Sequence, residues 1–153
     1  MAEEFKAIVF TLAHESYGIE VDKVRTIERM SPITRVPKTP PFVKGVINLR
    51  GAVVPVIDLR GRFGLPEKEP DDMTRIVIVA VADMEVGFIV DSATDVIDLT
   101  DDMVEEPPEA VGGVKAKYLR GVAKLPDGRL LVLLNLAEVL NKSEIIQLEE
   151  FGE

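Results

Sequence analysis

The chain repeats part of its own sequence, and this repeat limits what its 153 residues can fold into. Residues 7–22, AIVFTLAHESYGIEVD, align without gaps with residues 76–91, IVIVAVADMEVGFIVD. Further on, GVINLRGAVVPVIDL from Gly45 matches GVAKLPDGRLLVLLNL from Gly121, with one extra residue in the second turn. The repeat predicts two similar lobes within a single domain over residues 1–153.

Short apolar or β-branched runs separated by Gly, Pro and Asp predict that these lobes are mainly β. Two of the runs, residues 75–81 and 130–134, are apolar at nearly every position and do not alternate, so both faces of those strands must be buried. A single small barrel buries only its inner face. Two barrels packed against each other bury both faces, and we predict this arrangement with short helices between strands.

Approximate boundaries follow from the repeat: a first β-barrel over residues 13–75 and a second over 76–141. The strand expected at 5–12 and the C-terminal helix expected at 135–150 can pack across either lobe. Four polar residues follow strands and precede short helical turns, where they are predicted to accept hydrogen bonds from free amides as N-caps: Asp22, Asp58, Asp91 and Asn135.

The composition excludes most catalytic chemistry. There is no cysteine for disulfide, zinc-thiolate or nucleophilic roles, and the one histidine, His14, has no second histidine to complete a dyad or a metal site. No phosphate-binding or nucleophile motif occurs. We therefore expect no enzyme activity, no cofactor and no metal. The chain also shows no targeting segment and no apolar stretch of the roughly 20 residues that span a bilayer, so we expect it in the cytoplasm.

Charge is distributed unevenly along the chain, whose net charge is −9. Residues 22–62 hold nine Lys and Arg against three carboxylates, whereas residues 83–109 hold ten carboxylates and no Lys or Arg. The overall negative charge and the 5% aromatic content disfavour nucleic-acid binding. Two interpretations of the uneven charge stay open: two solvated faces, or docking to partners of opposite charge.

The segments TPPFVKGVINLRGAVVPVIDLR, YGIEVDKVRTIERMSPITRVP and VGFIVDSATDVIDL resemble the CheW family of bacterial chemotaxis coupling proteins. The resemblance runs from about residue 4 to residue 142. It implies two packed five-stranded SH3-like β-barrels and an adaptor that couples chemoreceptors, the methyl-accepting chemotaxis proteins, to the histidine kinase CheA. It also implies recruitment from the cytoplasm to membrane-associated receptor arrays, without insertion into the membrane.

The resemblance further implies the residues of a receptor and kinase interface. The receptor tip would lie along the groove between the barrels, and barrel ends would contact the CheW-like regulatory domain of the kinase. Some family members place a glutamate at the position of Thr26 that can pair with the arginine of the NLRG motif, Arg50; here Glu28 is two residues further on. The apolar members of the interface could equally be core residues. The predicted set is Val24, Gly45, Arg50, Ile76, Ala93 and Val96.

Three other functions stay open at this level. One is a CheW-like scaffold of a related non-flagellar motility or surface-sensing pathway. The others are a nucleic-acid-binding module and a minor enzyme, both of which the charge and the missing catalytic groups disfavour.

The turn at Arg50 differs in sequence between the two repeats. Its counterpart in the second repeat is Pro126-Asp127-Gly128, which is an ordinary turn sequence.

Overall fold

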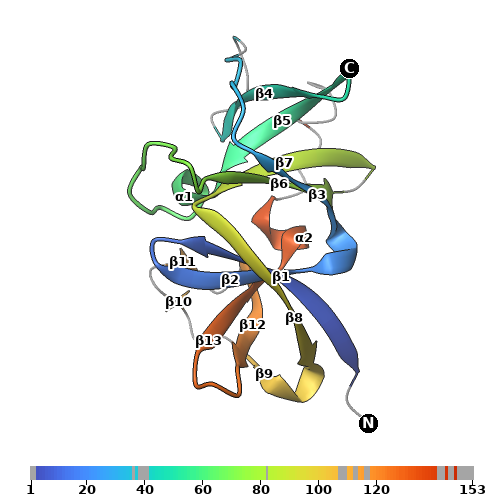
Figure 1. Ribbon diagram of the computed structural model, residues 1–153, viewed down its shortest axis with the longest axis vertical. Coiled ribbons are helices and arrows are strands. Elements are labelled where there is room, and N and C mark those ends of the chain that lie inside the picture. The colour runs from blue at the N-terminus through green and yellow to red at the C-terminus, as the bar shows by residue number, and fades with distance from the viewer. Residues whose placement is uncertain are drawn as a thin grey trace.

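The computed structural model describes residues 3–35, 37, 42–81, 83–106, 110–111, 114–115, 118–140, 144 and 147. They form a mainly β protein in which a five-stranded sheet occupies the upper half of Figure 1 and a six-stranded sheet the lower half. The five-stranded sheet has the order β3 (Val24–Arg29), β6 (Arg75–Val81), β7 (Met84–Val90), β5 (Ala52–Asp58) and β4 (Val43–Leu49). The six-stranded sheet has the order β8 (Ser92–Thr100), β1 (Glu4–Leu12), β2 (Glu15–Glu20), β13 (Leu130–Leu134), β12 (Leu119–Lys124) and β9 (Val104–Glu105).

Short helices and a small hairpin connect these strands. The 3-10 turns η1 (Val21–Lys23) and η2 (Asp101–Met103) each precede a strand, and α1 (Leu59–Arg62) follows β5. Strands β10 (Ala110–Val111) and β11 (Val114–Lys115) pair with each other. Helix α2 (Leu136–Val139) follows β13. No helix among the described residues is long and apolar enough to cross a bilayer.

The two sheets show that the sequence repeat is also a structural repeat. Strands β6, β7, β3, β4 and β5 of one sheet correspond to β1, β2, β8, β12 and β13 of the other, in the same spatial order. Both sheets contain one parallel pair at the matching place: Val56 lies opposite Gly87, and Leu133 lies opposite Gly18. All other pairs within these two sheets are antiparallel.

The predicted lobe boundaries at residues 13–75 and 76–141 differ from the observed division. The two repeats exchange their first hairpins. The β1–β2 hairpin of the first repeat joins β8, β12 and β13 of the second, and the β6–β7 hairpin of the second repeat joins β3, β4 and β5 of the first. The five-stranded sheet therefore spans residues 24–90, and the six-stranded sheet combines 4–20 with 92–134. A repeat read from sequence marks equivalent strands, but it does not show which copy each hairpin pairs with.

The exchanged hairpins bury side chains on both of their faces. On β6, the side chains of Ile76 and Ile78 face a cluster inside the five-stranded sheet, whereas Val77, Val79 and Val81 face a central cluster shared by both sheets. The corresponding β1 likewise divides its side chains between an inner cluster and the central one. Strands that are apolar on both faces thus lie between two cores, which confirms the prediction made from residues 75–81 and 130–134.

The predicted closed barrels and the predicted C-terminal helix are each seen only in part among the described residues. Neither sheet is closed by a continuous ladder among the described residues. In the five-stranded sheet the edges approach at the isolated bridge between Thr34 and Val46, and in the other sheet β8 continues through η2 into β9, which pairs with β12 at the opposite edge. Helix α2 covers four residues, and most of the helix predicted over 135–150 lies outside the described residues.

Of the predicted helix caps, the one at Asp58 is confirmed: its Oδ1 accepts from the Arg60 amide at 3.1 Å. The prediction was wrong for Asp22, which lies inside η1 and makes no cap hydrogen bond. It was also wrong for Asp91, because strand β8 follows directly and the carboxylate contacts other segments. The amide of Val139 donates to the backbone oxygen of Asn135 at 3.1 Å, at the start of α2.

Candidate functional site

The β4–β5 hairpin holds Arg50 in a backbone conformation that L-residues rarely adopt. Arg50 has φ +52° and Gly51 has φ +87°, which is the type I′ geometry of a two-residue hairpin turn. The Asn48 side chain supports the turn by accepting from the Gly51 amide at 3.1 Å. Such turns favour Asn or Asp followed by Gly, because few other residues tolerate the left-handed region. Arginine at this position therefore has no conformational advantage for the turn.

Arg50 reaches across to strand β3. Its Nη2 lies 3.8 Å from Glu28 Oε2, and the Arg50 side chain remains 69% exposed while that of Glu28 is 27% exposed. This distance is too long for a hydrogen bond, and ion pairs of such exposure contribute less than about 1 kcal/mol. Glu28, two residues after Thr26, is thus the carboxylate that lies beside Arg50, and the guanidinium stays accessible.

Alternate side chains of strand β3 point toward the protein interior, and Glu28, which lies beside Arg50, is one of them. Val24, Thr26 and Glu28 are half-buried, whereas the residues between them are exposed. Thr26 Oγ1 is buried without a hydrogen-bond partner among the described residues. Thr26 and Glu28 lie on one face of the strand, and of the two it is Glu28 that faces Arg50.

Gly45, another predicted interface residue, has a structural reason to be glycine. A Cβ there would lie 2.5 Å from the Thr34 carbonyl oxygen and 2.5 Å from Ile33 Cγ2. The matching Gly121 is equally constrained, with Val104 Cγ1 at 2.5 Å and the Glu105 carbonyl oxygen at 2.7 Å. In both sheets, glycine lets the chain that crosses from the far edge approach the strand closely.

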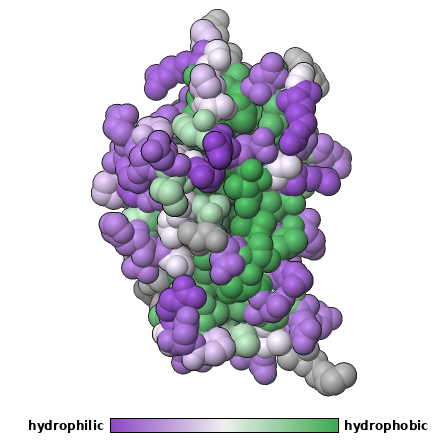
Figure 2. Space-filling view, viewed as in Figure 1, coloured by the Kyte–Doolittle hydropathy of each residue, from purple (hydrophilic) through white to green (hydrophobic). Residues whose placement is uncertain are grey.

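The apolar members of the predicted interface differ in accessibility. Ile76 is fully buried in the cluster inside the five-stranded sheet, so its side chain cannot touch a partner directly. Val24 and Ala93 are half-buried and pack against the central cluster, and Val96 is 51% exposed. Val24 and Ala93 each stand at the start of a strand just after the chain crosses between the sheets. On the face of the molecule that Figure 2 shows, hydrophobic surface lies in the middle, across the junction of the two sheets.

The structure thus divides the predicted set into a surface group and a supporting group. The surface group consists of Val24, Arg50, Ala93 and Val96; Gly45 and Ile76 shape the lobe beneath it. Within the described part of the chain, no three His, Cys, Asp or Glu side chains gather where they could hold a metal ion. The described residues thus place an exposed arginine on the five-stranded sheet and partly exposed apolar side chains on β3 and β8.

Comparison with known proteins identifies the family. The CheW-like domain matches residues 6–144, and the chain belongs to this family. Chemotaxis protein CheW of Bacillus subtilis is 45% identical over 90% of this chain and 87% of its own length, and that of Klebsiella aerogenes is 36% identical over 95% and 86%. The crystal structure of the scaffolding protein TtCheW from Thermoanaerobacter tengcongensis superposes with a TM-score of 0.81 at 34% identity, covering 91% of this chain and 89% of that one.

Proposed function

We propose that the chain is a chemotaxis adaptor that couples transmembrane chemoreceptors to the histidine kinase CheA. Membership of the CheW-like family supports this function, as do relatives named for chemotaxis that align over most of their length. The observation that carries the proposal within the chain itself is Arg50, an exposed arginine in a left-handed turn position that glycine, asparagine or aspartate would fill at lower cost.

The repeat strengthens this reading of Arg50. The corresponding hairpin between β12 and β13 uses Asp127 and Gly128, so the fold does not need an arginine at such a turn. Arginines that remain accessible next to apolar surface are common among residues that dominate binding energy at protein interfaces. We infer that Arg50 contacts the receptor tip, and that Glu28 holds the guanidinium near β3 until it does so.

The apolar surface at the junction of the sheets fits the rest of the proposed contact. Val24, Ala93 and Val96 would face the helical hairpin of a receptor, which would place one apolar stripe in the groove between the lobes. Gly45 and Ile76 would act from inside, by fixing the shape of the five-stranded lobe. The kinase would bind at the end of a lobe through its own CheW-like domain.

Two finer features belong to the same proposal. We infer that each sheet forms a five-stranded SH3-like barrel whose edges are joined by the chain after β3 or β8, with β9 counted as the continuation of β8. We also infer that the C-terminal segment forms a helix. We also infer that the adaptor acts without catalysis, in the cytoplasm at membrane-associated receptor arrays. The absence of cysteine and the single histidine in the sequence support a scaffold.

A pair of arginine variants tests the proposal. Arg50→Ala should lower receptor-dependent kinase activity about tenfold, because loss of a central interface arginine costs on the order of 1–3 kcal/mol. Arg129→Ala is the matched control: it removes an arginine of 63% exposure from the equivalent hairpin of the other sheet. The measurement is co-sedimentation of receptor fragment, kinase and adaptor, together with kinase activity. Normal kinase activation by a folded Arg50→Ala variant would contradict the proposal.

A further inference from the structure

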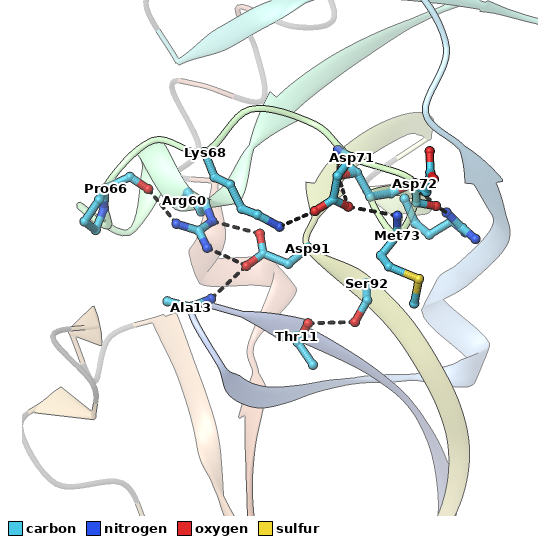
Figure 3. A network of polar contacts seen from close by, with 12 residues as sticks. Thr11, Ala13, Arg60, Pro66, Lys68, Asp71, Asp72, Met73, Asp91 and Ser92 are labelled. Atoms are coloured by element: carbon cyan, nitrogen blue, oxygen red, sulfur yellow. Dashed lines mark hydrogen bonds and ion pairs between the residues drawn. The ribbon is translucent and has the colours of Figure 1, made fainter.

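Asp91 lies where the chain leaves the five-stranded sheet at the end of β7 and enters the six-stranded sheet at β8. Its carboxylate accepts hydrogen bonds from Arg60 Nε at 2.8 Å, from Arg60 Nη2 at 2.5 Å and from the Ala13 amide at 2.9 Å. Its own amide donates to the Thr11 carbonyl oxygen at 2.9 Å. Figure 3 shows α1 and the β1–β2 turn converging on this one side chain. Segments of both sheets therefore hold the crossing.

Each nitrogen of the Arg60 guanidinium donates a hydrogen bond. Its remaining Nη1 donates to the Pro66 carbonyl oxygen at 2.7 Å, so all three nitrogens of the guanidinium are engaged. The side chains of Arg60 and Asp91 are only 13% and 16% exposed. A two-bond contact between arginine and a carboxylate fixes direction as well as distance. At this degree of burial, removal of either partner leaves a poorly compensated charge.

The repeat shows that the fold can make such a crossing without an ion pair. The first crossing, from β2 through η1 to β3, contains Asp22 at the position that matches Asp91. Asp22 is exposed, and its side chain makes no hydrogen bond or ion pair with any residue that the structure describes. The position that matches Arg60 is Ala137. Because one crossing forms without the pair, general folding requirements do not account for it at the other.

The same carboxylate also supports a strained turn. Ala13 and His14, which connect β1 to β2, have φ values of +51° and +69°. Residues other than glycine adopt this region at a cost of about 1 kcal/mol or more each. The hydrogen bond from the Ala13 amide to Asp91 holds the turn against the start of β8, and Ser92 Oγ lies 2.7 Å from Thr11 Oγ1 beside it. The junction is thus fixed at several points within a few residues.

We propose that the Arg60–Asp91 pair is a positioning element for receptor docking, which sets the direction in which β8 leaves the junction. Arg60 follows β5, whose other end begins at the Arg50 turn, and Asp91 precedes β8, which bears Ala93 and Val96. The pair therefore links the end of β5, the strand that follows the Arg50 turn, to the start of β8, the strand that carries Ala93 and Val96. This inference rests on the proposed receptor function for its purpose, but its structural part can be tested alone.

The structural part is tested by hydrogen exchange in the free protein. Asp91→Asn should accelerate exchange of the amides of Ala93 to Val96 about tenfold relative to the core amides of Val77 and Val79, because local opening is then easier than global unfolding. Lys124→Gln is the control, since it removes an exposed ion pair of the same sheet, with Glu105 at 3.3 Å. Unchanged exchange in β8, or equal acceleration in β8 and the core, would overturn the inference.

The functional part is tested by binding to two partners. Asp91→Asn and Arg60→Lys should weaken binding to a soluble receptor fragment about tenfold, while binding to the kinase regulatory domain changes less than about twofold. Arg60→Lys keeps the charge but cannot make the two-bond contact. Equal losses for both partners would mean general destabilisation and would overturn the inference. If the unmodified protein binds no receptor fragment, the proposed function fails, and the exchange experiment still decides whether the pair positions β8.

Discussion

The two sheets are built from equivalent strands in the same order, yet they differ at one hairpin and at one crossing. In the five-stranded sheet the β4–β5 turn contains Arg50, whereas the corresponding turn of the six-stranded sheet contains Asp127 and Gly128. At the crossings, Asp91 is bound by Arg60, whereas Asp22 is exposed. Each sheet therefore serves as an internal control for the other.

This comparison separates what the fold requires from what it does not. Features present in both sheets, such as the glycines at positions 45 and 121 and the parallel strand pair, are needed to build a lobe. Features present in one sheet alone, such as Arg50 and the Arg60–Asp91 pair, are not needed to build a lobe. We interpret the single features as specialised for contacts outside the lobe or for its orientation.

The first prediction concerns a shared feature and has the largest expected effect. Gly45→Ala and Gly121→Ala should each lower the free energy of unfolding by about 2–3 kcal/mol, because the new Cβ meets a backbone oxygen that cannot rotate away. Gly61→Ala is the control: its Cβ would meet nothing within 4 Å, and the change should stay within about 0.5 kcal/mol. Chemical denaturation measures all three. A large loss at only one of the two buried glycines would show that the lobes are not equivalent.

Much of the fold could be predicted from the sequence because the signals are local and repeated. Residues 76–81 are apolar at successive positions, which requires burial on both sides, and the structure places them between two cores. The exchange of hairpins could not be predicted, because β1–β2 and β6–β7 are so alike that either copy fits either sheet. Pairing with the correct partner depends on the short crossings at residues 21–23 and 91, whose geometry is not local.

The candidate site was less predictable for a related reason. Arg50 stands out from the sequence because a turn residue violates local preference. Asp91 does not, because an aspartate before a polar segment resembles a helix cap whether or not an arginine 31 residues earlier reaches it. The comparison of Arg60 with Ala137 in the repeat alignment is the signal that could have indicated the pair.

The second prediction concerns how the stability that each crossing contributes depends on pH. Partial burial pushes the pKa of Asp91 upward, but hydrogen bonds from the Arg60 guanidinium and the Ala13 amide outweigh it, so this pKa lies below the ordinary aspartate value. A lowered pKa in the folded state adds stability above the unfolded pKa, about 3.9, and this stability is lost as pH falls through the folded value.

The difference in free energy of unfolding between the unmodified protein and Asp91→Asn should therefore be constant near neutral pH and shrink as the pH drops below about 4. Asp22→Asn is the control: the Asp22 side chain is exposed and makes no hydrogen bond or ion pair with the described residues, so the free energy of unfolding should change by less than about 0.5 kcal/mol at neutral pH. Denaturation curves between pH 7 and pH 3 measure both differences. The expectation for Asp91 fails if its difference is independent of pH.

The last prediction addresses the hairpin and has the smallest effect on stability. Glu28→Gln removes the charge that faces Arg50 at 3.8 Å, and because the arginine is largely exposed the free energy of unfolding should change by less than about 0.5 kcal/mol. Receptor binding should weaken, but by less than for Arg50→Ala, since the guanidinium remains and only its orientation is freed. In the double variant, the Glu28 substitution should have no further effect once Arg50 is alanine. Additive losses in receptor affinity would instead mean that Glu28 contacts the receptor independently, so that the five-stranded sheet contributes two separate polar contacts.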